Sequence, residues 1–187
     1  MTLAEFLGSI VTALDASGIP YMITGSLAAA VHGAGRATMD ADLVVQVTSA
    51  QLGRLIDALE APGRYVSREA AMGALAHESV FNVIDTDTGW KADLIPCKTR
   101  PFSQVEFARR VPIELDGVRL WIASVEDLII SKLEWAKLGG SARQLEDATA
   151  LIRVVGGDID RPYLDRWVEE LRLSAQYAVV RAREDSM

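Results

Sequence analysis

The pattern of the sequence changes at Ser124, and this change constrains the architecture more than any other feature. Before Ser124, helical and strand-type segments alternate, whereas after it only helical spacing continues. Breaks at Gly139-Gly140 and Gly156-Gly157 divide the later part into three or four helices. We therefore predict an α+β fold, in which a mixed β-sheet core flanked by helices (residues 1–122) precedes a helical bundle (residues 123–187) packed on that core.

The spacing of apolar residues predicts the elements of the first part. A helix is expected from Leu3 to Leu14, ending at Ser17-Gly18, and a short alanine-rich helix at 27–31. A capping box at 48–51 begins a helix that reaches residue 59, while 62–76 gives only a weak signal of a loop and a short helix. Strands are predicted at 21–24, 42–47, 78–86, 90–95, 111–115 and 118–122, the last two as a hairpin around Asp116-Gly117.

Composition limits the class of protein. The 187 residues are 50% hydrophobic, which is enough for one good core. The single cysteine, Cys97, excludes an internal disulfide and thiolate metal sites, and it fits a reducing compartment. The N-terminus lacks a basic leader, and no apolar run approaches the ~20 residues of a membrane span. We expect a cytoplasmic protein without a membrane partner.

The net charge of -7 argues against general affinity for nucleic acid, which depends on neutralising phosphates. One stretch departs from this balance, because six bases outnumber four acids between residues 91 and 119. A solvated surface with uneven charge and a local basic groove are both open interpretations. The bases are Lys91, Lys98, Arg100, Arg109, Arg110 and Arg119, and the acids are Asp93, Glu106, Glu114 and Asp116.

Three aspartates form the main candidate site. Asp40 and Asp42 lie two residues apart where a strand opens, so their side chains share a face, with α-carbons about 6.5 Å apart. Such like charges are tolerated if they are solvated, paired, or bridged by a divalent cation, and Mg²⁺ binds one or two carboxylates together with phosphates. Asp93 interrupts an apolar strand, where a lone carboxylate is costly to bury. A third metal ligand on a neighbouring strand explains Asp93, while a solvated strand start is the alternative for the pair.

Gly25-Ser26 follows a strand and opens a helix. This position offers free backbone N–H groups and a small hydroxyl to an anion, and a side chain at Gly25 would block phosphates there. An ordinary strand-to-helix turn with a serine cap is the alternative.

The run from Gly25 to Asp42, GSLAAAVHGAGRATMDAD, resembles the signature of the DNA polymerase β-like nucleotidyltransferase superfamily. That signature is Gly-Ser or Gly-Gly, a short helix, then Arg-x-Thr-x-Asp-x-Asp. The run is similar to that of small bacterial members akin to the type IV toxin nucleotidyltransferases of abortive-infection systems. SVEDLIISK at 124–132, followed by Arg143 and Asp147, resembles their helical motif. The likeness spans roughly residues 21–151 and implies a nucleotidyltransferase-like core.

The resemblance implies Mg²⁺-dependent transfer of a nucleoside monophosphate from a nucleoside triphosphate such as ATP to an acceptor hydroxyl. The acceptor it implies is tRNA or a protein, whereas the small size and acidic charge also allow a small molecule such as an aminoglycoside. A toxin with an antitoxin partner chain and a non-catalytic nucleotide-binding or interaction module remain alternatives. The implied catalytic and metal-binding residues are Asp40, Asp42 and Asp93, and the implied nucleotide-binding residues are Gly25, Ser26, Arg36, Thr38, Lys132 and Asp147.

Several of these residues also have structural interpretations. Arg36 could be the counter-ion of the acidic pair, Lys132 and Asp147 could form an ion pair between helices, and Arg143 could support Asp147 one turn away. We expect His32 to cap or pack the preceding short helix. The spacing of four aromatic residues is typical of core positions: Trp121, Trp135, Tyr163 and Trp167.

Overall fold

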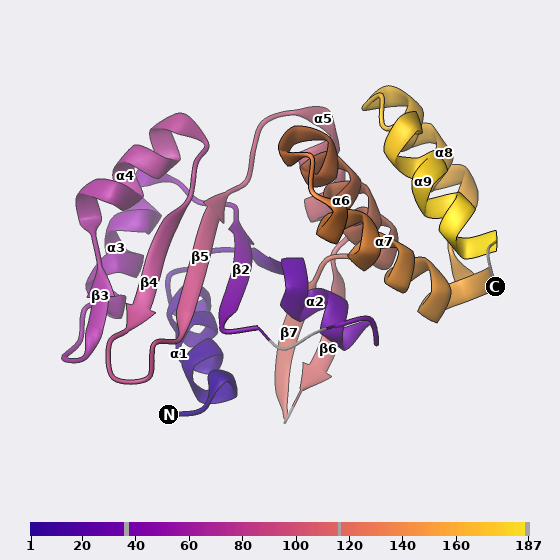
Figure 1. Ribbon diagram of the computed structural model, residues 1–187. Coiled ribbons are helices and arrows are strands. Elements are labelled where there is room, and N and C mark those ends of the chain that lie inside the picture. The colour runs from indigo at the N-terminus through magenta and orange to yellow at the C-terminus, as the bar shows by residue number, and fades with distance from the viewer. Residues whose placement is uncertain (36–37, 116, 186–187) are drawn as a thin grey trace. The chain divides into compact units, whose positions relative to one another are not determined.

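The computed structural model describes residues 1–35, 38–115 and 117–185 (Figure 1). The chain forms two compact units. The first comprises Met1–Leu27 and Ala37–Ile122, and the second comprises Ala28–Arg36 and Ala123–Met187. The short helix α2 (Gly25–Val31) contributes its first residues to one unit and the rest to the other.

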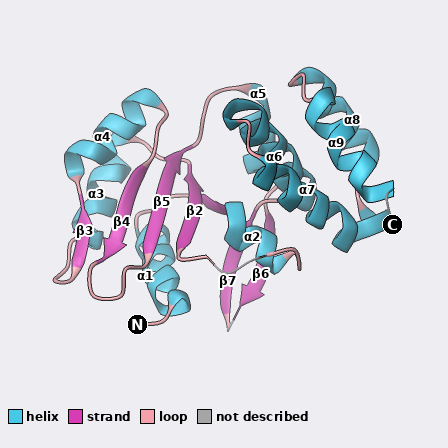
Figure 2. Ribbon diagram, in the orientation of Figure 1, coloured by secondary structure: helices cyan, strands magenta, loops and turns pink. Residues whose placement is uncertain are grey.

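The first unit contains a mixed seven-stranded sheet with the order β3-β4-β5-β2-β1-β7-β6 (Figure 2). Strands β2 and β5 are parallel, as are β1 and β7, while the other neighbours are antiparallel. The predicted mixed sheet and α+β class are therefore confirmed. The strands are β1 (Tyr21–Thr24), β2 (Asp40–Val45), β3 (Arg64–Val66), β4 (Phe81–Asp85), β5 (Lys91–Pro96), β6 (Val111–Leu115) and β7 (Val118–Ile122).

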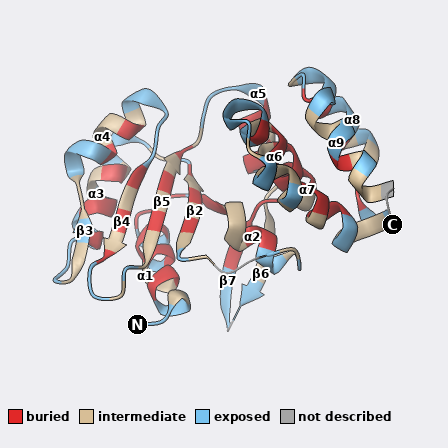
Figure 3. Ribbon diagram, viewed as in Figure 1, coloured by how far each residue is buried: buried red, intermediate tan, exposed pale blue. Residues whose placement is uncertain are grey.

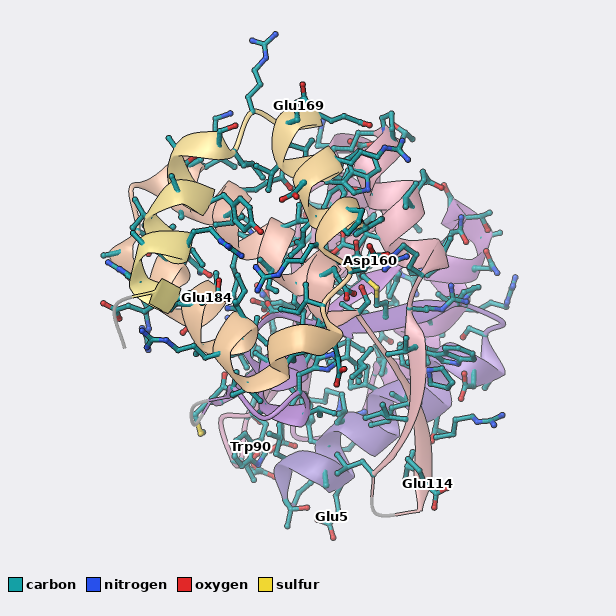
Figure 4. All side chains as sticks on the ribbon, turned by 90° about the vertical axis from the view of Figure 1, so that its right-hand side faces the viewer. Glu5, Trp90, Glu114, Asp160, Glu169 and Glu184 are labelled. Carbon is teal, nitrogen blue, oxygen red and sulfur yellow. The ribbon has the colours of Figure 1, made fainter. Side chains whose placement is uncertain are left out.

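Local signals fix the helices of this unit. Thr2 and Glu5 form a capping box at the start of α1, whose Glu5 is labelled in Figure 4. Thr48 and Gln51 form the same motif at α3, as the sequence predicts, and the Ser67 side chain caps α4. Helix α3 packs against both α1 and α4. The helices are α1 (Leu3–Ala16), α3 (Ser49–Leu59), α4 (Arg68–His77) and α5 (Pro101–Ala108).

The two faces of the sheet differ in burial, because side chains alternate along each strand. On β2 the residues Ala41, Leu43 and Val45 are fully buried, and Ala92 and Leu94 are fully buried on the neighbouring β5. The residues between them are only partly buried, which gives the alternating colours of these strands in Figure 3. The buried face anchors the sheet to the core, while the opposite face carries polar side chains together with the partly buried Val44 and Ile95.

The second unit is helical. Helix α6 begins at the predicted cap Ser124, whose hydroxyl accepts the Asp127 N–H at 3.2 Å, and ends at Gly140 with φ of 61°. The fully buried Asp127 carboxylate also accepts the Tyr163 hydroxyl at 2.5 Å, which ties α6 to α8. Glu184, labelled on α9 in Figure 4, pairs with Arg161 of α8 at 2.7 Å. The elements are α6 (Val125–Gly139), α7 (Ala142–Val155), a 3₁₀ turn (Gly156–Asp158), α8 (Arg161–Glu170) and α9 (Ser174–Asp185).

Some details differ from the sequence-based expectations. Strand β2 begins at Asp40 rather than at residue 42, and neither β3 nor α5 was predicted. Trp135 was expected in the core but is 62% exposed on α6, whereas Trp167 is buried. None of the helices in the described segments has the length and apolar character needed to cross a bilayer.

Candidate active site

The three aspartates meet on the partly buried face of two adjacent parallel strands. In the β2–β5 register, Asp42 lies opposite Asp93, and Asp40 lies opposite Lys91. Residues two apart on a strand share a face. The four side chains therefore form a rectangle of three carboxylates and one ammonium, which brings together the predicted metal ligands and adds a lysine that was not among them.

The Asp93 carboxylate is held through both of its oxygens. Asn82, its register partner on β4, donates to Oδ1 at 2.5 Å, and Lys91 Nζ donates to Oδ2 at 3.1 Å. Lys91 Nζ also lies 3.6 Å from Asp40 Oδ1. The side chains are 31% exposed for Lys91, 20% for Asp93 and 50% for Asp40. The cost of burying Asp93 is thus offset by a neutral donor and an ion pair.

Opposing effects act on the Lys91 ammonium. Partial burial, the largest effect, lowers its pKa, while the hydrogen bond and charge of Asp93 and the charge of Asp40 raise it. Together the carboxylates outweigh burial, and the pKa of Lys91 lies above its ordinary value. Lys91 is therefore a cation at neutral pH.

Gly25 lies against Asp42, at the junction of β1 and α2. A β-carbon at Gly25 would lie 2.0 Å from Asp42 Oδ2 and 2.9 Å from its Cγ, and the φ of Gly25 is +65°. From the sequence, this glycine was expected to leave room for phosphates. The structure adds a different reason, because the Asp42 carboxylate itself occupies the space where a side chain would begin.

The other predicted phosphate contacts differ in their surroundings. Ser26 is half-buried at the start of α2. The Thr38 hydroxyl accepts the Asp40 N–H at 3.2 Å and donates to the Asp40 carbonyl at 3.1 Å, so it fixes the start of β2. Arg36 lies outside the described residues.

Lys132 and Asp147 belong to the second unit and pair there. The Lys132 ammonium, with a side chain only 6% exposed, lies 2.8 Å from Asp147 Oδ2 and 3.4 Å from the Gln144 amide oxygen. This is the interhelical ion pair that the sequence left open. In the same unit, His32 Nε2 lies 2.9 Å from the Ala123 carbonyl oxygen, in keeping with its expected packing role.

The basic stretch of residues 91–119 has largely local partners. Lys91 contacts the aspartates, Arg100 stacks on Phe102 and donates to Ser103, and the Arg110 guanidinium lies over Phe107 and Trp121. Reversing the charge of Arg110 would disrupt packing as well as charge, so that substitution is a poor probe of nucleic-acid binding.

The three aspartates are ligands of the type that Mg²⁺ binds. Asp40, Asp42 and Asp93 supply carboxylate oxygens, and the positively charged Lys91 ammonium lies between two of these side chains. The described part of the chain holds no group of three or more His, Cys, Asp and Glu side chains gathered as around a metal. Mg²⁺ needs only one or two carboxylates when phosphates and waters complete its shell.

The fold is that of the nucleotidyltransferases, as comparison with solved structures shows. The crystal structure of ANT(2″)-Ia in complex with adenylyl-2″-tobramycin superposes with a TM-score of 0.57 at 16% identity, over 98% of this chain and 99% of that one. The solution structure of the antibiotic-resistance factor ANT(2″)-Ia gives 0.52 at 16% identity, over 97% and 96%. An antigenic nucleotidyltransferase-like protein from Paracoccidioides brasiliensis gives 0.56 at 18% identity, over 91% and 90%.

At these identities the likeness concerns the fold. No protein-family model matches the sequence, and no curated protein matches it significantly. The fold that the resemblance implies, that of the nucleotidyltransferases, is confirmed. The narrower likeness to toxin members stays a prediction.

Two residues of the site, Lys91 and Asn82, escaped the sequence analysis. Lys91 stands two positions before Asp93, and Asn82 is a polar residue between the apolar Phe81 and Val83. The alternation of the strands places both side chains on the face of Asp93. The positions of Lys91 and Asn82 in their strands can be read from the sequence. Their contact with Asp93 follows only when the pairing of β4, β5 and β2 is known.

Proposed function

We propose that this chain is a Mg²⁺-dependent nucleotidyltransferase that moves a nucleoside monophosphate from a nucleoside triphosphate to an acceptor hydroxyl. The observation that carries the proposal is the in-register pair Asp42 and Asp93 with Asp40 on the same face. The fold shared with nucleotidyltransferases supports it. A purely structural protein has little reason to gather three carboxylates on one face.

Each residue has a distinct task in this proposal. Asp40, Asp42 and Asp93 would hold Mg²⁺, which when bound neutralises phosphate charge and stabilises the leaving pyrophosphate. Asn82 keeps the Asp93 carboxylate in position through its 2.5 Å hydrogen bond. Asp93 would also accept the proton of the acceptor hydroxyl. Gly25 and Ser26 would contact the triphosphate next to Asp42, with which Gly25 is in contact.

Among the acceptor classes, we favour a small cationic molecule with a free hydroxyl. The net charge of -7 attracts cations and repels nucleic acid. The local partners of Lys91, Arg100 and Arg110 weaken the alternative of a basic groove for tRNA. One structure of the same fold was solved with an adenylylated antibiotic, adenylyl-2″-tobramycin. A tRNA or protein acceptor and a toxin role with an antitoxin chain are the competing outcomes of the test.

The test is pyrophosphate release and label transfer with Mg²⁺ and each labelled triphosphate. Aminoglycosides, tRNA and cell extract are offered in parallel as acceptors. We expect transfer to a small molecule by the wild type and a loss of at least a hundredfold in Asp42→Asn. The matched control, Asp15→Asn, removes an exposed carboxylate of α1 and should leave the rate unchanged. Equal rates in both variants would refute the assigned site.

The ion pairs of Lys91 favour a second candidate, a non-catalytic nucleotide-binding module. Carboxylates neutralised by a built-in ammonium can persist without a metal. Such a module would bind a triphosphate without splitting pyrophosphate from it, whichever acceptor is offered, so turnover separates the two candidates.

A further inference from the structure

The Lys91 ammonium takes the position of a cation within the carboxylate face. It lies 3.1 Å from Asp93 Oδ2 and 3.6 Å from Asp40 Oδ1, and thus bridges aspartates on two strands. The other oxygen of Asp93 is satisfied by Asn82 at 2.5 Å. The rectangle of three aspartates and Lys91 carries a formal charge of -2, which would be -3 without the lysine.

We propose that Lys91 is an internal competitor of the divalent cation, holding Asp40 and Asp93 together until the metal displaces it. The proposal rests on the proposed function, since it concerns the same carboxylates. Mg²⁺ takes its ligands at about 2.0–2.1 Å. A metal bound to oxygens of both aspartates would therefore need the space that the Lys91 ammonium occupies. The lysine stem is flexible and 31% exposed, so the ammonium can swing into solvent.

The need to displace Lys91 weakens metal binding, because its contacts with Asp40 and Asp93 must be broken first. Partly exposed ion pairs contribute little each, so the effect is modest. Removing the ammonium should tighten metal binding about three- to tenfold. The same ammonium relieves the repulsion between Asp40 and Asp93 while no metal is bound.

The experiment measures binding of Mn²⁺, a probe for Mg²⁺, to the full chain without nucleotide. Free Mn²⁺ is followed by its electron paramagnetic resonance signal at 0.15 M salt, where distant charges are screened. We compare the wild type with Lys91→Met, with Lys91→Gln as a second neutral variant, and with Lys91→Arg, which keeps the charge. The matched control, Lys98→Met, removes an exposed lysine from the same unit.

We expect both neutral variants at Lys91 to bind Mn²⁺ three- to tenfold more tightly, while Lys91→Arg and Lys98→Met stay within twofold of the wild type. Mn²⁺ should also raise the melting temperature of Lys91→Met more than that of the wild type. Equal or weaker binding by the neutral variants, with wild-type binding intact, would overturn the competition and leave the proposed function standing. Absence of Mn²⁺ binding by every variant would also overturn the competition, whereas the proposed function is decided by label transfer, in which the triphosphate is present.

Discussion

Replacing Gly25 by alanine tests the contact on which the geometry of the site depends. Two costs arise. A φ of +65° is strained for any residue with a β-carbon, by about 1–2 kcal/mol. The new methyl would also lie 2.0 Å from Asp42 Oδ2 and 3.2 Å from its Cβ, so rotation of the carboxylate alone cannot relieve the overlap. Overpacking of this kind costs about 1–3 kcal/mol, which gives a total of roughly 2–5 kcal/mol.

Gly18 provides a matched control for this experiment. Its φ is +64°, almost that of Gly25, yet a β-carbon there would meet nothing within 4 Å. Gly18→Ala should therefore cost only the backbone strain of about 1–2 kcal/mol. The difference between the two variants isolates the contact with Asp42.

The assay is urea unfolding followed by circular dichroism, repeated in an Asp42→Ala background. We expect Gly25→Ala to cost at least 1 kcal/mol less in that background, since most of the overlapping atoms are gone. Gly25→Ala should also abolish nucleotide transfer, because Asp42 must move. Equal destabilisation by Gly25→Ala and Gly18→Ala would show that Asp42 does not oppose a side chain at position 25.

Two further predictions concern residues outside the cluster of Asp40, Asp42 and Asp93. Burial, followed by the charges of Glu106 and Glu78, raises the pKa of the Cys97 thiol to about 11, so the folded chain holds little thiolate at pH 8. Alkylation of the folded chain by iodoacetamide at pH 8 should be on the order of a hundredfold slower than that of the urea-unfolded chain, and it should accelerate as the pH rises toward 11. Folded and unfolded rates within threefold of each other at pH 8 would contradict this expectation. Lys132→Met deprives the Asp147 carboxylate of its ammonium partner and should cost about 3 kcal/mol in urea unfolding. Adding Asp147→Leu should recover most of that loss, and a cost below about 1 kcal/mol for the single variant would argue against a structural ion pair.

Elements with local signals were predictable from the sequence. The capping box of Thr48 and Gln51, the cap Ser124 and the break at Gly140 act within a few residues of one another. Strand β3 was missed because three residues at the edge of the sheet, paired only with β4, show no periodicity. Helix α5 was missed because its N-cap, Arg100, makes no capping hydrogen bond with its side chain.

The candidate site was likewise predictable only where the signal is local in the sequence. The spacing of Asp40 and Asp42 was enough to place both on one face, and the motif supplied Gly25. The contacts of Lys91 and the overlap that excludes a side chain at Gly25 depend on residues brought close by pairing between strands. Trp135 has the spacing of a core residue, but its helix presents it to solvent, and periodicity alone does not fix which stripe of a helix is covered.

The split of α2 between the two units has a consequence for synthesis on the ribosome. His32 meets the carbonyl of Ala123, which follows 91 residues later, and a β-carbon at Gly33 would come within 3.0 Å of a methyl of Val154. Translation proceeds at about 5–20 residues per second, so Ala123 is synthesised roughly 5–20 s after His32. The sheet can begin to assemble before the residues that the segment from Ala28 onward contacts, Ala123 and Val154, have been synthesised. Slow translation after residue 122 would therefore lengthen the time for which the nascent chain leaves that segment exposed to solvent.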